Sequence, residues 1–294
     1  MMLFLAALAA ATAGQSPYTP ELEALMRHRD EKRAAETRNR IANEQQGSGL
    51  ASVMPPAIAE RLSTCLTSAD LKPETGLADA AKWASEGGGA YAAHCKGYSL
   101  GKAGRFADAA AAFESGAVLP NTDAATQARL WSQAGNAALA GGDAARALAD
   151  LNHALDKPLP ASLSTGEIHL DRARARVVNG DLKGARSDID QTLVMAPQDP
   201  LAWLLSATLA RRMDDLPMAR AHIEQAARLS RNDADIALEQ GVIYALSGDR
   251  DPAAKAAFQR AQDVAPKGSA VAGKATTYLA QLAQAAPAPA PTPK

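Results

Sequence analysis

The sequence carries one short pattern five times, and this repetition limits the folds that the chain can adopt. Each copy has a small residue, then a turn seven residues later, then an alanine that follows the turn. The small residues are Gly97, Gly135, Ala173, Ala207 and Gly241, and the turns centre on Gly104, Gly142, Gly180, Asp214 and Gly248. The alanines are Ala109, Ala147, Ala185, Ala219 and Ala254. Successive alanines are 38, 38, 34 and 35 residues apart, and a period of this size indicates stacked supersecondary units.

The spacing predicts two antiparallel helices in each copy. A small residue on the first helix and an alanine on the second let the two backbones approach closely, and a glycine turn supplies the left-handed end of the first helix. Large residues then fill the space around each crossing. They are Trp131 and Trp203 on first helices, and Phe113, Leu151, Ile189, Ile223 and Phe258 on second helices. Pro197 and Pro266 close their copies, where a new helix begins.

Composition agrees with an all-helical chain. About 70 of the 294 residues are alanine, the best intrinsic helix former. Aromatic residues make up only 4% of the chain, whereas a β-sandwich would be rich in aromatic and β-branched residues. The formal net charge of −1 excludes a polybasic nucleic-acid binder, which needs excess positive charge to release phosphate counterions.

Over residues 90–266 the pattern resembles the tetratricopeptide repeat family, whose 34-residue unit is a helix-turn-helix. The Trp, Gly, Ala, Phe or Ile, and Pro positions carry the resemblance. Two copies are longer, with extra loop residues near 121–122 and 158–164. The resemblance implies an all-α, right-handed α-solenoid of about five repeats. Residues 57–89, with Trp83, are expected to form a helical cap or degenerate repeat, and residues 267–285 a C-terminal capping helix.

The N-terminal 13 residues are predicted to be a signal peptide, followed by a short linker over 14–20. An uncharged apolar run precedes Ala11-Thr12-Ala13, which has the small-x-small form of a cleavage site. The run lacks a basic n-region, so the alternative is an N-terminal helix that packs on the domain. We therefore expect an exported, periplasmic protein without an integral membrane segment in its mature chain. Residues 286–294 alternate alanine and proline and are expected to form an extended tail.

Residues 21–46 are predicted to form one charged helix, because this stretch contains no glycine or proline. Its six basic and six acidic residues favour a solvated helix with ion pairs between successive turns. The alternative is a short coiled coil, although the apolar heptad positions are not sustained. Residues 47–56 are expected to form a linker.

The two cysteines, Cys65 and Cys95, allow two interpretations. Exported compartments permit them to pair, and the loop of about 30 residues would contribute roughly 3 kcal/mol in the chain-entropy model. The alternative is two buried free thiols on neighbouring helices.

The sequence contains no recognisable catalytic, cofactor or metal motif. Its histidines stand singly, without metal-ligand spacing; they are His28, His94, His153, His169 and His222. His94 adjoins Cys95, but adjacent positions of a helix point in different directions, so this is not a catalytic pair. We therefore expect no enzyme and no cofactor.

The resemblance implies that the first helices line a concave groove that holds peptides. The residues expected to face this groove are Tyr91, Tyr98, Lys102, Arg129, Ser132, Asn136, Glu167, Leu170, Arg174, Leu201, Leu204, Thr208, Arg211 and Arg212. The main binding candidates among them are Tyr98, Lys102, Arg129, Asn136, Arg174, Arg211 and Arg212. Their positive charges would suit a carboxylate or an acidic peptide. Asn136 fits the asparagine of the family's carboxylate clamp, but its lysine partners are not evident. The alternative is that the arginines pair with nearby aspartates, namely Asp171, Asp188, Asp190 or Asp215.

Arg172 and Arg176 lie four residues apart, where the family has apolar or aromatic residues. We expect them to point toward the second helix of the same repeat and to pair with Asp188 and Asp190. An unpaired charge at this place would cost several kcal/mol.

The sequence therefore predicts a non-catalytic scaffold of the cell envelope that binds a protein or peptide in its groove. The alternative is a chaperone-like or assembly factor that uses its outer face and the helix over 21–46. Neither the partner nor the oligomeric state follows from the sequence.

Overall fold

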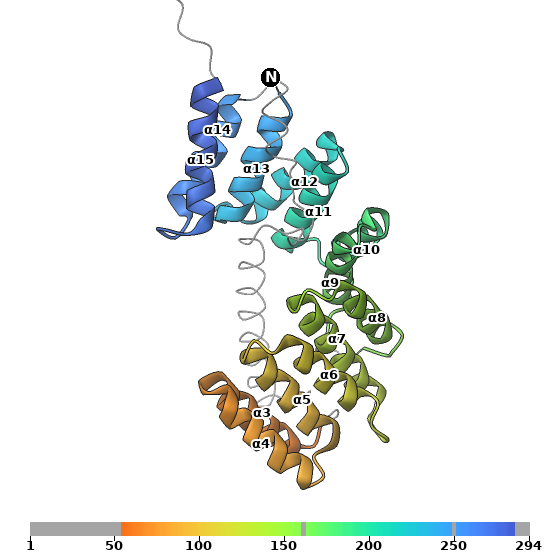
Figure 1. The fold of residues 1–294 in the computed structure, drawn as a ribbon. Coiled ribbons are helices and arrows are strands. Elements are labelled where there is room, and N and C mark those ends of the chain that lie inside the picture. The colour runs from red at the N-terminus through yellow and green to blue at the C-terminus, as the bar shows by residue number, and fades with distance from the viewer. Residues whose placement is uncertain (1–53, 160–162, 249–250, 286–294) are drawn as a thin grey trace, which may run out of the picture. The chain divides into compact units, whose positions relative to one another are not determined.

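The computed structural model describes residues 54–159, 163–248 and 251–285. These residues form helices joined by short turns, with no strand among them (Figure 1), so the prediction of an all-α repeat fold is confirmed. The predicted signal peptide, the 14–20 linker, the charged helix over 21–46 and the tail over 286–294 lie outside the described residues, as does most of the linker over 47–56.

The described residues divide into two compact units, one up to Met195 and the other from Ala196 onward. The helices of the first unit are α3 (Pro56–Leu71), α4 (Pro73–Ser85), α5 (Gly89–Lys102), α6 (Phe106–Ala117), α7 (Ala124–Ala140), α8 (Ala144–Leu155), α9 (Thr165–Val178) and α10 (Leu182–Met195). Those of the second unit are α11 (Pro200–Arg212), α12 (Leu216–Leu229), α13 (Ala234–Leu246), α14 (Asp251–Val264) and α15 (Ala270–Ala285).

Each predicted crossing is formed by a pair of helices that pack along their length. The pairs are α5 with α6, α7 with α8, α9 with α10, α11 with α12, and α13 with α14. The five crossing alanines are all 0% exposed. At three crossings the small residue makes room for the large one: a Cβ built on Gly97, Gly135 or Gly241 would lie 2.4–2.6 Å from Phe113, Leu151 or Phe258. Close packing therefore requires the small residue, because a methyl group would overlap the large side chain.

The turns have the left-handed backbone that the glycines predict. Gly104, Gly142, Gly180 and Gly248 have φ between 72° and 80°, and Asp214, which replaces glycine, has φ of 61°. The next helix is capped by an aspartate side chain: Asp143 Oδ1 accepts from the backbone N–H of Arg146 at 3.0 Å. Asp181 and Asp215 make the same contact in their repeats. These carboxylates fix where each second helix begins.

A disulfide joins Cys65 of α3 to Cys95 of α5, with Cα atoms 6.1 Å apart. Both residues are buried, in a cluster that also contains Trp83 of α4. The bond links the first helix pair, α3 and α4, to the first clear repeat. The free-thiol alternative does not describe this structure, since both cysteines belong to the bridge.

At the other end, α15 packs on α13 and α14. The rings of Tyr278 and Phe258 are 5.1 Å apart between centroids, and Leu279 and Leu282 pack against the same cluster. The helix therefore covers apolar surface of the last repeat, which is what a capping helix does. Within the described residues, no helix combines the length and the hydropathy that crossing a membrane requires.

Candidate functional site

The first helices α5, α7 and α9 are neighbours in the first unit, because α7 packs against both of the others (Figure 1). On each helix one polar residue directly follows the small crossing residue: Tyr98 follows Gly97, Asn136 follows Gly135 and Arg174 follows Ala173. Since the repeats are equivalent, these three side chains occupy one position on consecutive helices. We call Tyr98, Asn136 and Arg174 the binding row; all three were binding candidates from the sequence.

At its N-terminal end the binding row is held by an acidic residue of α3. The Tyr98 hydroxyl donates to Asp70 Oδ1 at 2.7 Å, and Lys102 Nζ lies 2.9 Å from the same oxygen. Lys102 also lies over the Tyr98 ring, 5.4 Å from its centroid. The charge of Lys102 is therefore balanced by Asp70, a partner that the sequence had not indicated.

Arg129 of α7 lies close to two residues of α5, Tyr91 and His94. Burial lowers the pKa of the Arg129 guanidinium from its usual value, and the nearby Tyr91 and Asp123 oppose this. Burial, with a smaller contribution from Arg129, lowers the pKa of His94 to about 3. His94 is thus neutral at physiological pH, and its ring packs edge-on to Phe113.

Asn136 has an unsatisfied acceptor in the middle of the binding row. Its Oδ1 atom is buried and has no hydrogen-bond partner in the structure. A buried carbonyl oxygen without a donor costs about 1–3 kcal/mol. A ligand that supplies an N–H or O–H group at this point would remove that cost.

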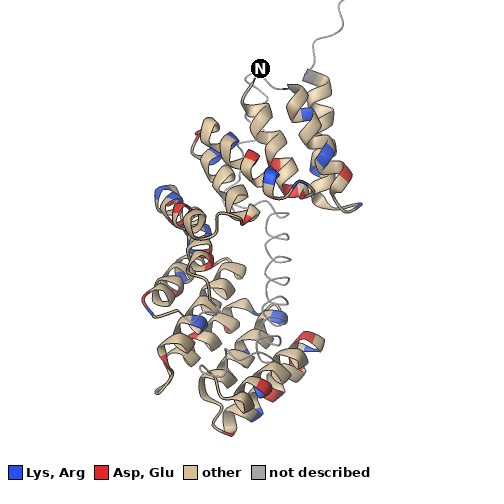
Figure 2. Cartoon of the chain, turned by 180° about the vertical axis from the view of Figure 1, so that it is seen from behind, with Lys and Arg blue, Asp and Glu red and all other residues tan. Residues whose placement is uncertain are grey.

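Two of the arginines expected to give the groove positive charge form ion pairs with carboxylates. Arg174 Nη1 pairs with Asp171 Oδ1 at 3.0 Å, as the alternative interpretation anticipated. In the second unit, Arg211 Nε pairs with Glu239 Oε1 at 2.6 Å, and the charge of Glu239 raises the pKa of Arg211. Arg212 is exposed at the end of α11. Basic and acidic residues are interspersed along the described helices (Figure 2).

Four residues expected to face the groove are buried instead. They are Ser132, Leu170, Leu201 and Leu204, with exposed fractions between 1% and 8%. Their positions belong to the contacts between helices, where apolar or small side chains fill the core.

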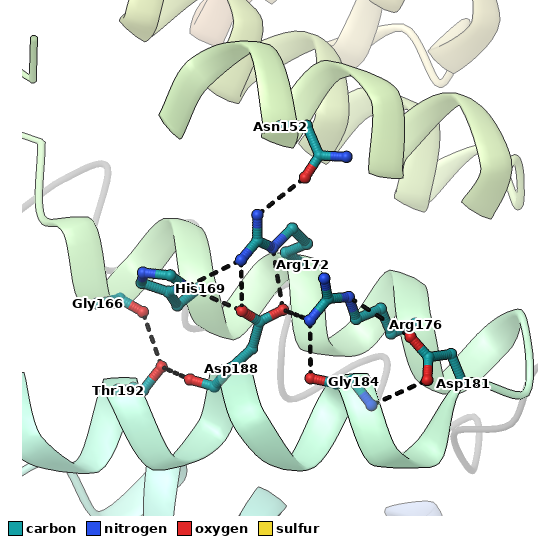
Figure 3. Close-up of polar contacts among 9 residues, drawn as sticks. All are labelled: Asn152, Gly166, His169, Arg172, Arg176, Asp181, Gly184, Asp188 and Thr192. Atoms are coloured by element: carbon teal, nitrogen blue, oxygen red, sulfur yellow. Dashed lines mark hydrogen bonds and ion pairs between the residues drawn. The ribbon is translucent and has the colours of Figure 1, made fainter. Parts of the chain in front are cut away.

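Arg172 and Arg176 converge on Asp188, which is buried on α10 (Figure 3). Arg172 donates from Nε and Nη2 to the two carboxylate oxygens at 3.0 and 2.7 Å. Arg176 Nη1 lies 2.9 Å from Oδ2, and His169 Nδ1 lies 2.9 Å from Oδ1. The expected half-buried cluster is therefore present, with His169 as an additional member. We call Asp188, Arg172, Arg176 and His169 the Asp188 cluster.

Asp190 does not belong to this cluster, which corrects the second half of the prediction. It pairs with Arg186 on its own helix at 2.6 Å, and its side chain is 59% exposed. Residues two apart on a helix point in different directions, so Asp188 and Asp190 cannot both face α9.

Sequence reasoning missed Asp150 on α8. It is 3% exposed, and its Oδ2 atom is buried without a hydrogen-bond partner. Asp150 stands three residues after Ala147, as Asp188 stands three after Ala185, so comparing the two repeats would have identified it. No group of three or more histidine, cysteine or acidic residues within the described ranges is arranged to hold a metal ion.

The tetratricopeptide repeat family model matches residues 132–200 and 204–269. The search of curated proteins finds no match.

Solved structures share the fold at low sequence identity. The APC/C hetero-tetramer Cut9–Hcn1 has a TM-score of 0.55 at 14% identity, covering 79% of this chain and 44% of that one. MamA residues 41-end from Desulfovibrio magneticus RS-1 has a TM-score of 0.52 at 15% identity, covering 60% and 94%. YrrB, described as a TPR protein with an unusual peptide-binding site, has a TM-score of 0.49 at 19% identity, covering 64% and 92%. The family match, together with the crossings and turns described above, shows that residues 132–269 carry tetratricopeptide repeats.

Proposed function

We propose that the chain is a non-catalytic scaffold that binds a peptide or a protein segment along the first helices α5, α7 and α9. The observation that carries this proposal is the buried, unpartnered Oδ1 of Asn136 in the middle of the binding row. An unused acceptor on one of three adjacent helices favours a ligand that presents a hydrogen-bond donor there. A peptide backbone provides such donors at regular intervals.

The side chains around Asn136 support a ligand of mixed character. Tyr98 and Tyr91 offer aromatic surface on α5, and Arg129 brings a desolvated cation from α7. Lys102 and Arg174 are held by Asp70 and Asp171. These ion pairs reduce the net charge of the face, so the face does not present a continuous basic wall to an acidic ligand.

The binding proposal is tested by affinity capture from an envelope extract, with quantification of the captured proteins by mass spectrometry. Asn136→Ala should reduce recovery of a specific partner about tenfold, since one hydrogen bond in a buried site is lost. Gln191→Ala is the matched control, because Gln191 is exposed on the second helix α10. Equal recovery by both variants, with unchanged melting temperatures, would show that the partner binds at another site.

We further propose that the protein acts outside the cytoplasm, in the cell envelope. The disulfide between Cys65 and Cys95 supports this location, because such bonds persist in oxidising compartments. Cell fractionation of the full chain and of a chain lacking residues 1–13 tests the idea. Export should depend on those residues, and thiol titration of the exported, denatured protein should detect no free cysteine. Recovery of the full chain in the cytoplasm with two free thiols would refute the proposal.

The alternative, an assembly or chaperone-like role through the helix over 21–46, rests on residues outside the described ranges. It remains a prediction. Deleting residues 21–46 distinguishes the two roles, because binding along the first helices does not require that segment.

A further inference from the structure

Asp150 is buried at the junction between two repeats, next to the ion pair between Glu114 and Arg146. It belongs to α8, and Glu114 of α6 lies beside it. Glu114 is itself held by Arg146 of α8, whose Nε atom is 2.5 Å from Glu114 Oε1. Arg146 Nη1 also reaches the backbone oxygen of Ala107 on α6. One arginine thus joins the two helices, while two carboxylates share the space next to it.

The charged groups around Asp150 do not neutralise it. On α8, Arg146 is attractive but is engaged by Glu114, and Asp143, which caps the start of that helix, adds a further negative charge. On α7 the position equivalent to Arg172 is Ala134, which offers no polar side chain. From α9, Arg172 reaches α8 only at Asn152, 2.8 Å away, while its other nitrogens bind Asp188. Asp150 Oδ2 consequently lacks a donor.

A buried carboxyl group in this setting is more stable with its proton than without it. Burial is the main cause, and the negative charge of Glu114 is the second; together they raise the pKa of Asp150 to about 7. The protonated carboxyl group of Asp150 can also donate a hydrogen bond to Glu114, whereas two ionised carboxylates have no donor between them.

We propose that Asp150, Glu114 and Arg146 form a proton-dependent joint between the first and second repeats, which is tight while the carboxyl pair holds a proton and loosens when that proton leaves. The proton comes from solvent and returns to it, so no other reactant is needed. Because α6 and α8 each pack on α7, a change at the joint reaches the helix that carries Asn136.

The direction of the effect follows from the two protonation states. In the packed state the proton is held up to a pH of about 7, whereas an exposed aspartate loses it near its ordinary value of 3.8. Stability of the joint is therefore greatest at low pH, falls as the pH rises from about 4 to about 7, and is level above that.

Hydrogen exchange of the full chain, corrected for the intrinsic pH dependence of exchange, tests the proposal. Protection of α6 and α8 should fall roughly fiftyfold between pH 5 and pH 7. Protection of α11 and α12 serves as the internal reference. Asp150→Asn, which is neutral at every pH and can donate to Glu114, should abolish this fall. Asp190→Asn makes the same change on an exposed residue and should leave the fall intact.

The titration of Asp150 itself provides a second, independent measurement. The 13C resonance of its carboxyl group should change with a midpoint near pH 7 in the wild-type chain. In Glu114→Gln the midpoint should move to lower pH, because a negative charge is removed and Arg146 is released. A wild-type midpoint near pH 4, or identical exchange profiles for wild type and Asp150→Asn, would overturn the proposal.

Discussion

Asp150 and Asp188 occupy the same place in consecutive repeats, three residues after the crossing alanine, and are equally buried at 3% and 2% exposure. Asp188 accepts hydrogen bonds from Arg172, pairs with Arg176 and contacts a histidine. Asp150, by contrast, has a second carboxylate as neighbour and one oxygen without a partner. The repeat therefore fixes the position of the buried carboxylate but not its chemistry. The chemistry of each carboxylate depends on the first-helix residues opposite it, which lie on α9 for Asp188 and on α7 for Asp150.

The second-helix residue at this position is polar in three consecutive repeats, and its partner on the first helix differs in each of them. In the repeat of α11 and α12 the pair is Ser206 and His222, with Oγ 2.7 Å from Nδ1. In the repeat of α9 and α10 it is Arg172 and Asp188. In the repeat of α7 and α8 the pair is Ala134 and Asp150, and there the polar partner is missing. A helix crossing thus tolerates a buried polar group, and its stability depends on one matching side chain.

The largest expected effect comes from removing the carboxylate of the Asp188 cluster. Asp188→Ala removes the anion that Arg172 and Arg176 share at a half-buried site, and should lower the free energy of unfolding by about 3–5 kcal/mol. Asp150→Ala should cost far less, because that carboxylate has an oxygen with no partner to lose. Chemical denaturation at pH 8 compares the two variants. Similar losses would show that the two sites are energetically alike, and the comparison would fail.

A smaller loss is expected when only one donor of the Asp188 cluster is removed. Arg172→Ala takes away both hydrogen bonds of the Arg172 guanidinium to Asp188 and its bond to Asn152, and should cost about 2 kcal/mol. Arg176 and His169 still contact Asp188, which limits the damage. A double-mutant cycle of Arg172 and Asp188 should give a coupling energy of about 1–3 kcal/mol. An unchanged melting temperature for Arg172→Ala would contradict the placement of its charge.

The sequence predicted the fold because the fold depends on local and repeated requirements. Gly97 and Phe113 show why: the approach of α5 and α6 needs a residue without a side chain opposite a large one, and this pairing recurs at a fixed distance along the chain. The left-handed turns and the aspartate caps obey equally local rules. The pairing of Arg172 with Asp188 was predictable for the same reason, since both lie within one repeat.

The candidate site was less predictable, because some of its charges are balanced by residues of a neighbouring helix pair. Lys102 meets Asp70, and Arg211 meets Glu239, across sequence distances that vary with loop length. Periodicity identifies which side of a helix a residue occupies, but not which side chain of the next helix reaches it. The unsatisfied oxygen of Asn136 is a property of its surroundings, and no feature of the sequence marks it.

The smallest effect is expected from giving Asp150 the kind of partner that His222 has. Ala134→Ser places a hydroxyl group at the position equivalent to Ser206, where it can donate to the ionised carboxylate of Asp150. The hydroxyl should favour the charged form, lower the pKa of Asp150 and reduce the loss of unfolding free energy between pH 5 and pH 8 by about 0.5–1.5 kcal/mol. At pH 5 the substitution should bring no gain, because a serine in a helix is slightly less stable than an alanine. Ala138→Ser, at another buried position of α7, controls for that intrinsic cost. If both serine variants show the same pH profile, Ala134 and Asp150 are not in contact, and the missing partner of Asp150 has to be sought on α6 rather than on α7.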